Sequence, residues 1–74
     1  MTPDHLAALM RRLDALNGVS AVIAESGLVV EADGRHVCRW APDGAHLTGA
    51  FPCEAALLCA ATVDEAYSLT VGRF

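Results

Sequence analysis

Apolar residues recur every three or four positions over residues 3–17, which is the spacing of an amphipathic helix. The apolar stripe consists of Leu6, Leu9, Met10, Leu13 and Leu16. Thr2 can cap this helix and Pro3 suits its first position. Asn17-Gly18 is expected to end it, because Gly18 can adopt the left-handed conformation of a C-cap.

Three turn sequences then separate short apolar runs and predict a meander of antiparallel strands. The turns are Ser26-Gly27, Asp33-Gly34 and Ala41 to Ala45, and the strands are 19–25, 28–32, 35–40 and 46–51. Asp-Gly is among the strongest two-residue hairpin signals, and Ser-Gly is a weaker one.

Two-residue turns fix a register, and the register decides which side chains share a face. The first hairpin is expected to place Glu25 opposite Leu28. The second is expected to place Ala32 opposite Arg35. Ile23, Val30 and Val37 then form one row across three strands. The predicted core face contains Val19, Ala21, Ile23, Leu28, Val30, Ala32, Val37, Leu47 and Phe51.

The reverse face is less polar than a solvated sheet face should be. It is predicted to carry Val22, Ala24, Val29, Glu31, His36, Cys38, Trp40, His46, Thr48 and Ala50, with Trp40 paired to His46. Half of these residues are apolar, and one is the only tryptophan. The face is therefore expected to be covered by the second helix, by a second copy or by a foreign partner.

The C-terminal region is predicted to be helical from Pro52 onward. Ala56, Cys59, Ala60, Val63 and Tyr67 keep helical spacing. Thr62 to Glu65 is also a capping-box pattern, so the region is either one helix or two that meet near residue 62. Residues 68–74 alternate weakly, which fits either a frayed tail or an edge strand.

These elements define a single α+β domain over residues 1–74: a two-layer sandwich with a four-stranded antiparallel meander. Both the N-terminal helix and the C-terminal helical region are expected on one face. The chain has 74 residues and is 54% hydrophobic but only 5% aromatic. Its core is therefore thin, and self-association is one way to reinforce it.

The formal net charge is −4, and the chain contains no lysine. This balance disfavours direct nucleic-acid binding, which depends on clustered basic residues, and favours a basic protein surface as partner. No apolar run approaches 18 residues and the start lacks a basic segment, so neither a membrane span nor a signal peptide is expected. Cys38, Cys53 and Cys59 contain no Cys-x-x-Cys pair and are expected to be reduced thiols in a cytoplasmic protein.

Candidate chemistry centres on Glu31, His36, Cys38 and His46, which share the predicted reverse face. All four are metal ligands by type, but their spacing is not that of a zinc finger or ribbon. Cys38 and His36 are the only thiol–imidazole pair available, and residues two apart on a strand lie too far apart for a ready hydrogen bond. We therefore expect no catalytic site, no bound metal and no cofactor, so the protein is not expected to be an enzyme.

The order helix, strands, helix is similar to that of double-stranded-RNA-binding domains. Those domains use lysine-rich contacts at the start of the second helix. Here that region reads Phe51-Pro52-Cys53-Glu54-Ala55, which disfavours RNA binding.

In its short length, acidity, single α/β domain and lack of a catalytic motif, the whole chain resembles the small phage- and mobile-element-encoded anti-CRISPR proteins. The resemblance implies direct binding to a CRISPR surveillance complex that blocks its access to target DNA. Members of that group share no common fold or motif, so it implies no functional residue.

The sequence thus predicts a non-enzymatic inhibitor or regulator that binds a larger protein or ribonucleoprotein assembly in a bacterial cytoplasm. The predicted partner-binding residues are Trp40, Glu31, Asp33, Asp43, His36 and His46. One alternative is a self-associating structural or adaptor protein in which the Trp40 face is a homodimer interface. Another is a small metal- or thiol-dependent regulator that acts through His36, Cys38 and His46.

Overall fold

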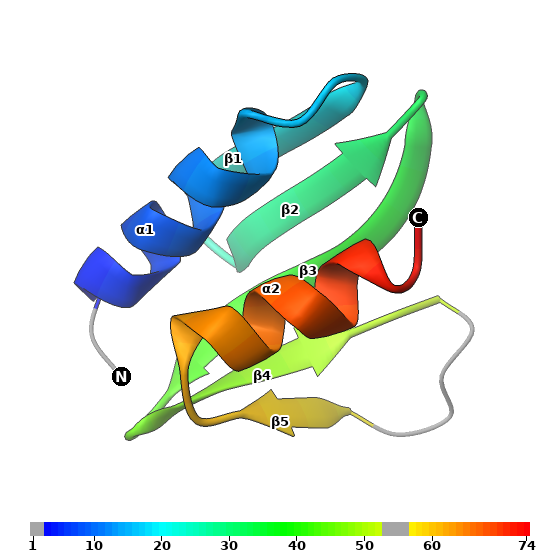
Figure 1. The fold of residues 1–74 in the computed structure, drawn as a ribbon. Coiled ribbons are helices and arrows are strands. Elements are labelled where there is room, and N and C mark those ends of the chain that lie inside the picture. The colour runs from blue at the N-terminus through cyan, green and yellow to red at the C-terminus, as the bar shows by residue number, and fades with distance from the viewer. Residues whose placement is uncertain (1–2, 53–56) are drawn as a thin grey trace.

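The computed structural model describes residues 3–52 and 57–74 and has the predicted α+β architecture, with a five-stranded rather than four-stranded sheet. Its elements are α1 (Pro3–Asp14), β1 (Val19–Ala24), β2 (Gly27–Ala32), β3 (Arg35–Asp43), β4 (His46–Ala50), β5 (Leu58–Ala60) and α2 (Val63–Val71). The strands are antiparallel and follow chain order across the sheet, β1-β2-β3-β4-β5 (Figure 1).

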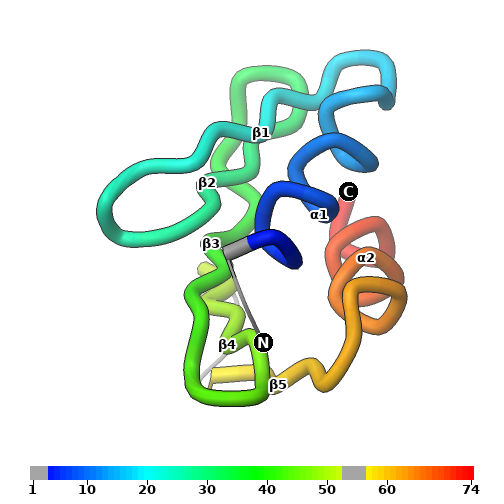
Figure 2. The backbone as a smooth tube through the Cα atoms, turned by 90° about the vertical axis from the view of Figure 1, so that its left-hand side faces the viewer, coloured from blue at the N-terminus to red at the C-terminus, as the bar shows by residue number. Residues whose placement is uncertain are grey.

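Both helices lie on one side of the sheet, so the described residues form two layers, and none of their helices lies on the other sheet face (Figure 2). The predicted stripe of α1 is confirmed, because Leu6, Leu9 and Leu13 are buried against the sheet. The helix ends at Asp14, three residues earlier than predicted, and Gly18 has the expected positive φ of 77°. The Thr2 cap lies outside the described residues.

The second hairpin has the predicted register, with Ala32 opposite Arg35. Its turn residues Asp33 and Gly34 have φ angles of 54° and 77°, as the mirror-image hairpin turns require. The Asp-Gly signal was therefore sufficient to locate this turn.

Strand β3 contains a β-bulge shortly after this turn. The bulge changes which residues share a face of the sheet. Glu31 pairs with His36, but the next residue of β2, Val30, pairs with Cys38, so Val37 is the extra residue. Val37 and Cys38 are both buried, and beyond the bulge Trp40 also lies on the helix-covered side. In the predicted row of Ile23, Val30 and Val37, the pairing of Val30 with Val37 is wrong for this reason.

The first hairpin is shifted by two residues from its predicted register. Ala24 pairs with Gly27, so Ile23 lies opposite Leu28 and is 44% exposed instead of central in the core. A Cβ on Gly27 would lie 2.2 Å from the Trp40 carbonyl oxygen. Gly27 therefore permits a close approach of two strands and does not form the turn.

The third hairpin also differs, because β3 continues to Asp43, which pairs with His46. Trp40 consequently lies opposite Gly49, and not opposite His46 as predicted. A Cβ on Gly49 would lie 2.7–2.9 Å from ring atoms of Trp40, so the absence of a side chain makes room for the indole.

The C-terminal region contains a strand where helix was predicted. Leu58–Ala60 forms β5 and pairs with residues 47–49 of β4. The boundary near residue 62 is confirmed: the Thr62 hydroxyl accepts a hydrogen bond from the Glu65 backbone N–H at 3.1 Å and caps α2. Residues 68–71 continue α2, so they form neither a frayed tail nor an edge strand. Residues 53–56 of the predicted helical region lie outside the described residues.

Candidate functional site

The covered side of the sheet holds the tryptophan that was predicted to be exposed. Trp40 has no exposed surface, and its ring meets that of Phe51 edge-on with centroids 5.7 Å apart. Its indole Nε1–H donates a 2.7 Å hydrogen bond to the Thr70 hydroxyl on α2. The prediction that Trp40 forms part of an exposed binding face is therefore wrong, and so is a homodimer interface built on its side chain.

Cys38 lies beside Trp40 in the same buried layer and not on the predicted reverse face. Its Sγ donates to the Thr70 hydroxyl at 4.0 Å, and Thr70 in turn donates to the Ala66 carbonyl at 2.7 Å. Burial raises the pKa of the Cys38 thiol from its ordinary 9.0 to about 11, partly offset by hydrogen bonds with Thr70 and Trp40. Cys38 is therefore a protonated core residue and not an activated nucleophile.

The uncovered sheet face carries two neighbouring valines on β1 and β2, and Arg39 of the central strand β3 lies opposite Val29. Its acidic and imidazole side chains lie toward its two ends. Register and strand alternation assign to it Ser20, Val22, Ala24, Val29, Glu31, His36, Arg39, Ala41, Asp43, His46, Thr48, Ala50 and Cys59. Val22 lies opposite Val29 on the next strand, and Val22 is 57% exposed. We call this set of residues the open face, because neither α1 nor α2 packs against it (Figure 2).

Four of the predicted partner-binding residues besides Trp40 lie on the open face, but in two separate groups. Glu31 and His36 are cross-strand partners, as predicted, near the β2–β3 turn that carries Asp33. Asp43 and His46 pair with each other at the opposite end of β3. Asp43 follows His36 by seven positions along one strand, which amounts to roughly 20 Å.

The structure does not assemble the metal-ligand set that the sequence suggested. Cys38 points to the core, while His36 and His46 lie at opposite ends of the open face. Within residues 3–52 and 57–74, no group of three or more His, Cys, Asp and Glu side chains is arranged to hold a metal ion.

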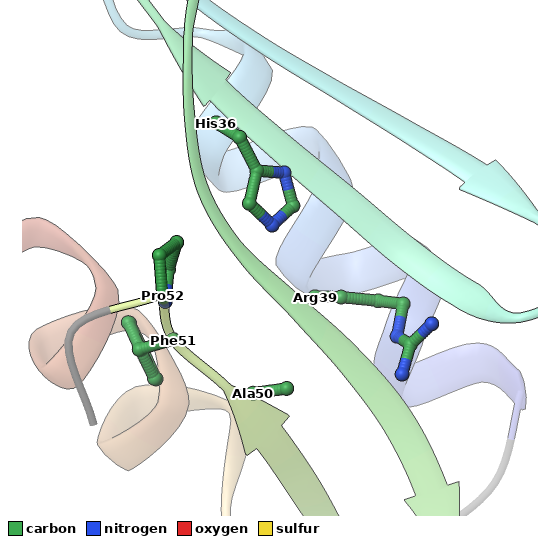
Figure 3. A pocket seen from close by; sticks show the side chains of 5 residues that line it. All are labelled: His36, Arg39, Ala50, Phe51 and Pro52. Atoms are coloured by element: carbon green, nitrogen blue, oxygen red, sulfur yellow. The ribbon is translucent and has the colours of Figure 1, made fainter. Parts of the chain in front are cut away.

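A hollow of about 380 Å³ lies where β3 and β4 separate. The β3–β4 pairing reaches Arg39 opposite Ala50, and the chain then turns away at Phe51 and Pro52. His36 and Arg39 of β3 form one side of the hollow, and residues 50–52 form the other (Figure 3). We call this feature the bulge pocket.

Arg39 is the residue of this site that sequence reasoning missed. It was not assigned to the reverse face because unbroken alternation sends His36 and Arg39 to opposite sides. The bulge adds one residue between them and brings both to the open face. The available signal was that residues 37, 38 and 40 are all apolar, which unbroken alternation cannot place on one side.

Comparisons with protein-family models, curated protein sequences and solved structures find no match for this chain. Among the described residues, neither helix combines the length and the apolar character that crossing a membrane would require.

Proposed function

We propose that the chain is a non-enzymatic protein-binding module whose contact surface is the open face. The observation that carries this proposal is the one-sided packing of both helices, which leaves Val22 of β1 and Val29 of β2 on a sheet face that no described helix covers. Solvated sheet faces normally alternate to polar residues, and exposed apolar patches mark interaction sites.

The separation of Cys38 from His36 supports a role without covalent catalysis. These residues were the one thiol–imidazole pair suggested by the sequence, and they lie on opposite sides of the sheet. The Thr70 hydroxyl, which accepts a hydrogen bond from the Cys38 thiol, also binds the Trp40 indole and so connects α2 to the sheet.

For the partner, we propose a larger protein or ribonucleoprotein assembly with a basic surface, and a CRISPR surveillance complex as the specific candidate. The net charge of −4 and the acidic residues around the open face support this choice. Glu31, Asp33 and Asp43 would face basic residues that otherwise hold phosphates. Such an inhibitor would act in the cytoplasm of a bacterial host and would occlude the path of target DNA.

The first test is a substitution in the apolar part of the open face, at Val29 of β2. Val29→Asp places a charge where a partner must pack, and it leaves the helix-covered core intact because Val29 belongs to the open face. Ser68→Asp adds the same charge on exposed α2 and serves as the matched control. Inhibition of target-DNA binding by purified surveillance complexes should be lost in Val29→Asp and retained in Ser68→Asp.

Loss in both variants, or in neither, would contradict a contact through the open face. If the wild-type chain leaves every surveillance complex active, the specific partner is wrong. If the wild-type chain has the solution mass of a dimer and Val29→Asp has the mass of a monomer, the open face binds a second copy instead.

The acidic residues predict a steep salt dependence of partner binding. The combined variant Glu31→Lys, Asp33→Asn and Asp43→Lys should weaken binding and flatten its dependence on salt. Asparagine is chosen at residue 33 because it tolerates the positive φ of this turn. Asp4→Lys, which reverses an exposed carboxylate on α1 of the helical layer, is the control. Binding that is insensitive to salt and to the sheet variant would leave the apolar pair Val22 and Val29 as the source of affinity.

A further inference from the structure

One wall of the bulge pocket is polar and consists of His36 and Arg39, and the opposite wall is apolar. The bulge at Val37 turns His36 and Arg39 toward the same face, although they are three residues apart on a strand. The opposite wall consists of the Ala50 methyl group, Phe51 and the Pro52 ring (Figure 3). A volume of about 380 Å³ is within the range of small-molecule sites.

From this geometry we infer that the bulge pocket binds a carboxylate carried on a compact apolar body. The guanidinium of Arg39 can donate two parallel hydrogen bonds to the two carboxylate oxygens. His36 supplies an imidazole N–H donor on the same side, whatever its protonation state. The apolar body then packs against Ala50 and Pro52. This site goes beyond the proposed function and does not depend on it.

The charges around the pocket favour a ligand with a single negative charge over a phosphate dianion. Glu31 lies directly opposite His36 on β2, so a carboxylate already borders the cationic side. A phosphate dianion would meet stronger repulsion there and would need more donors than one guanidinium and one imidazole. A carboxylate needs only the planar fork of Arg39.

The apolar wall is preformed, whereas the cationic side can adjust. Phe51 is buried and held edge-on by Trp40, and the Pro52 ring restricts the backbone beside it. Arg39 is exposed, and its guanidinium extends along the face away from Pro52 (Figure 3). Binding therefore requires a rotamer change of one exposed side chain, which costs little compared with opening the core.

The test is an NMR titration of the ¹⁵N-labelled full chain with sodium benzoate and, separately, with benzamide. The two probes have nearly the same shape, and only benzoate carries the charge. Benzoate should shift the amide signals of His36, Arg39 and Ala50 saturably, with a Kd on the order of 1 mM, as expected for so small a ligand. Benzamide should bind at least tenfold more weakly.

Arg39→Gln should reduce benzoate affinity at least tenfold. Arg11→Gln, at an exposed position of α1, should leave it unchanged. Both variants remove one positive charge, so a difference between them separates a specific site from general charge attraction. Equal binding of benzoate and benzamide, unsaturable shifts, or equal effects of the two substitutions would each overturn the assignment.

A second pair of probes identifies the source of the carboxylate. A tripeptide that ends in phenylalanine is titrated with a free and with an amidated C-terminus. Tighter binding of the free acid than of benzoate would identify a peptide C-terminus as the ligand. Binding of benzoate with no response to the peptide would assign the pocket to a free small acid. Neither result depends on whether the open face binds a partner.

Discussion

Thr70 is the residue through which α2 is fixed to the sheet by polar contacts. Its buried hydroxyl accepts from the Trp40 indole N–H and the Cys38 thiol and donates to the Ala66 carbonyl. A buried N–H that loses its acceptor keeps the full cost of its desolvation. Thr70 therefore matters for stability more than its size suggests.

Replacing Thr70 with valine should lower the free energy of unfolding by about 1–3 kcal/mol. Valine keeps the shape but leaves the Trp40 N–H without its acceptor. Thr70→Ser retains the hydroxyl and should cost less than Thr70→Val. Urea unfolding of the three proteins measures the difference, and equal stability of Thr70→Val and wild type would contradict this role.

The raised pKa of the Cys38 thiol implies that the free energy of unfolding depends on pH in the alkaline range. Its pKa is about 11 in the folded chain and near 9.0 when exposed, so between these values the folded state retains a proton that the unfolded state has lost. The free energy of unfolding should therefore fall as pH rises from about 9 to 11, by at most about 2–3 kcal/mol for this group.

Denaturant titrations across this pH range should show a smaller fall for Cys38→Ala than for wild type. The same burial should make Cys38 slow to react with a thiol reagent in the native protein, while exposed Cys59 reacts readily. A titration under denaturing, non-reducing conditions should find all three cysteines of the chain free. Rapid native labelling of Cys38, or parallel pH curves for the two proteins, would contradict its burial as a thiol.

At the level of elements, β4 can pair with β3 beside the Trp40 ring because Gly49 has no side chain. Gly49 lies under the Trp40 ring, and a methyl group there would have to displace the indole. Gly49→Ala should therefore lower the free energy of unfolding by about 1–3 kcal/mol. In a Trp40→Leu background the same substitution should cost much less, and additive losses in the double-mutant cycle would disprove the contact.

The sequence predicted the elements whose signals are local. The Asp33-Gly34 turn, the stripe of α1 and the Thr62 cap each depend on a few neighbouring residues, and all three agree with the structure. The pairing of Glu31 with His36 follows from that turn and is also confirmed.

The remaining errors arise where distant residues decide the local structure. The bulge at Val37 allows β3 to bury both Val37 and Cys38, which unbroken alternation would separate. β5 has three residues, too few for periodicity to distinguish strand from helix, and it forms by pairing with β4. Both features required knowledge of the neighbouring strand. Arg39 and the bulge pocket were missed for the same reason.

At the scale of the whole molecule, the chain is a sheet with one covered face and one open face. The buried residues of α1, α2 and the sheet form one cluster on the covered side. Arg12 of α1 forms an ion pair with Asp64 of α2 and also lies 4.1 Å from the Tyr67 ring centroid, so the two helices contact each other as well as the sheet. The proposed partner surface and the bulge pocket both depend on this one-sided arrangement.

The fluorescence of Trp40 measures this arrangement directly, because Trp40 is the only tryptophan and excitation at the red edge of the indole absorption band avoids Tyr67. Its fluorescence should be blue-shifted in the native chain and nearly insensitive to acrylamide and iodide, and it should become strongly quenched on unfolding in urea. In a chain whose solution mass is that of a monomer, this result would place Trp40 under the helices. Native emission like that of free tryptophan, with ready quenching by iodide, would place Trp40 on the outer face and contradict the bulge, the open face and the pocket together.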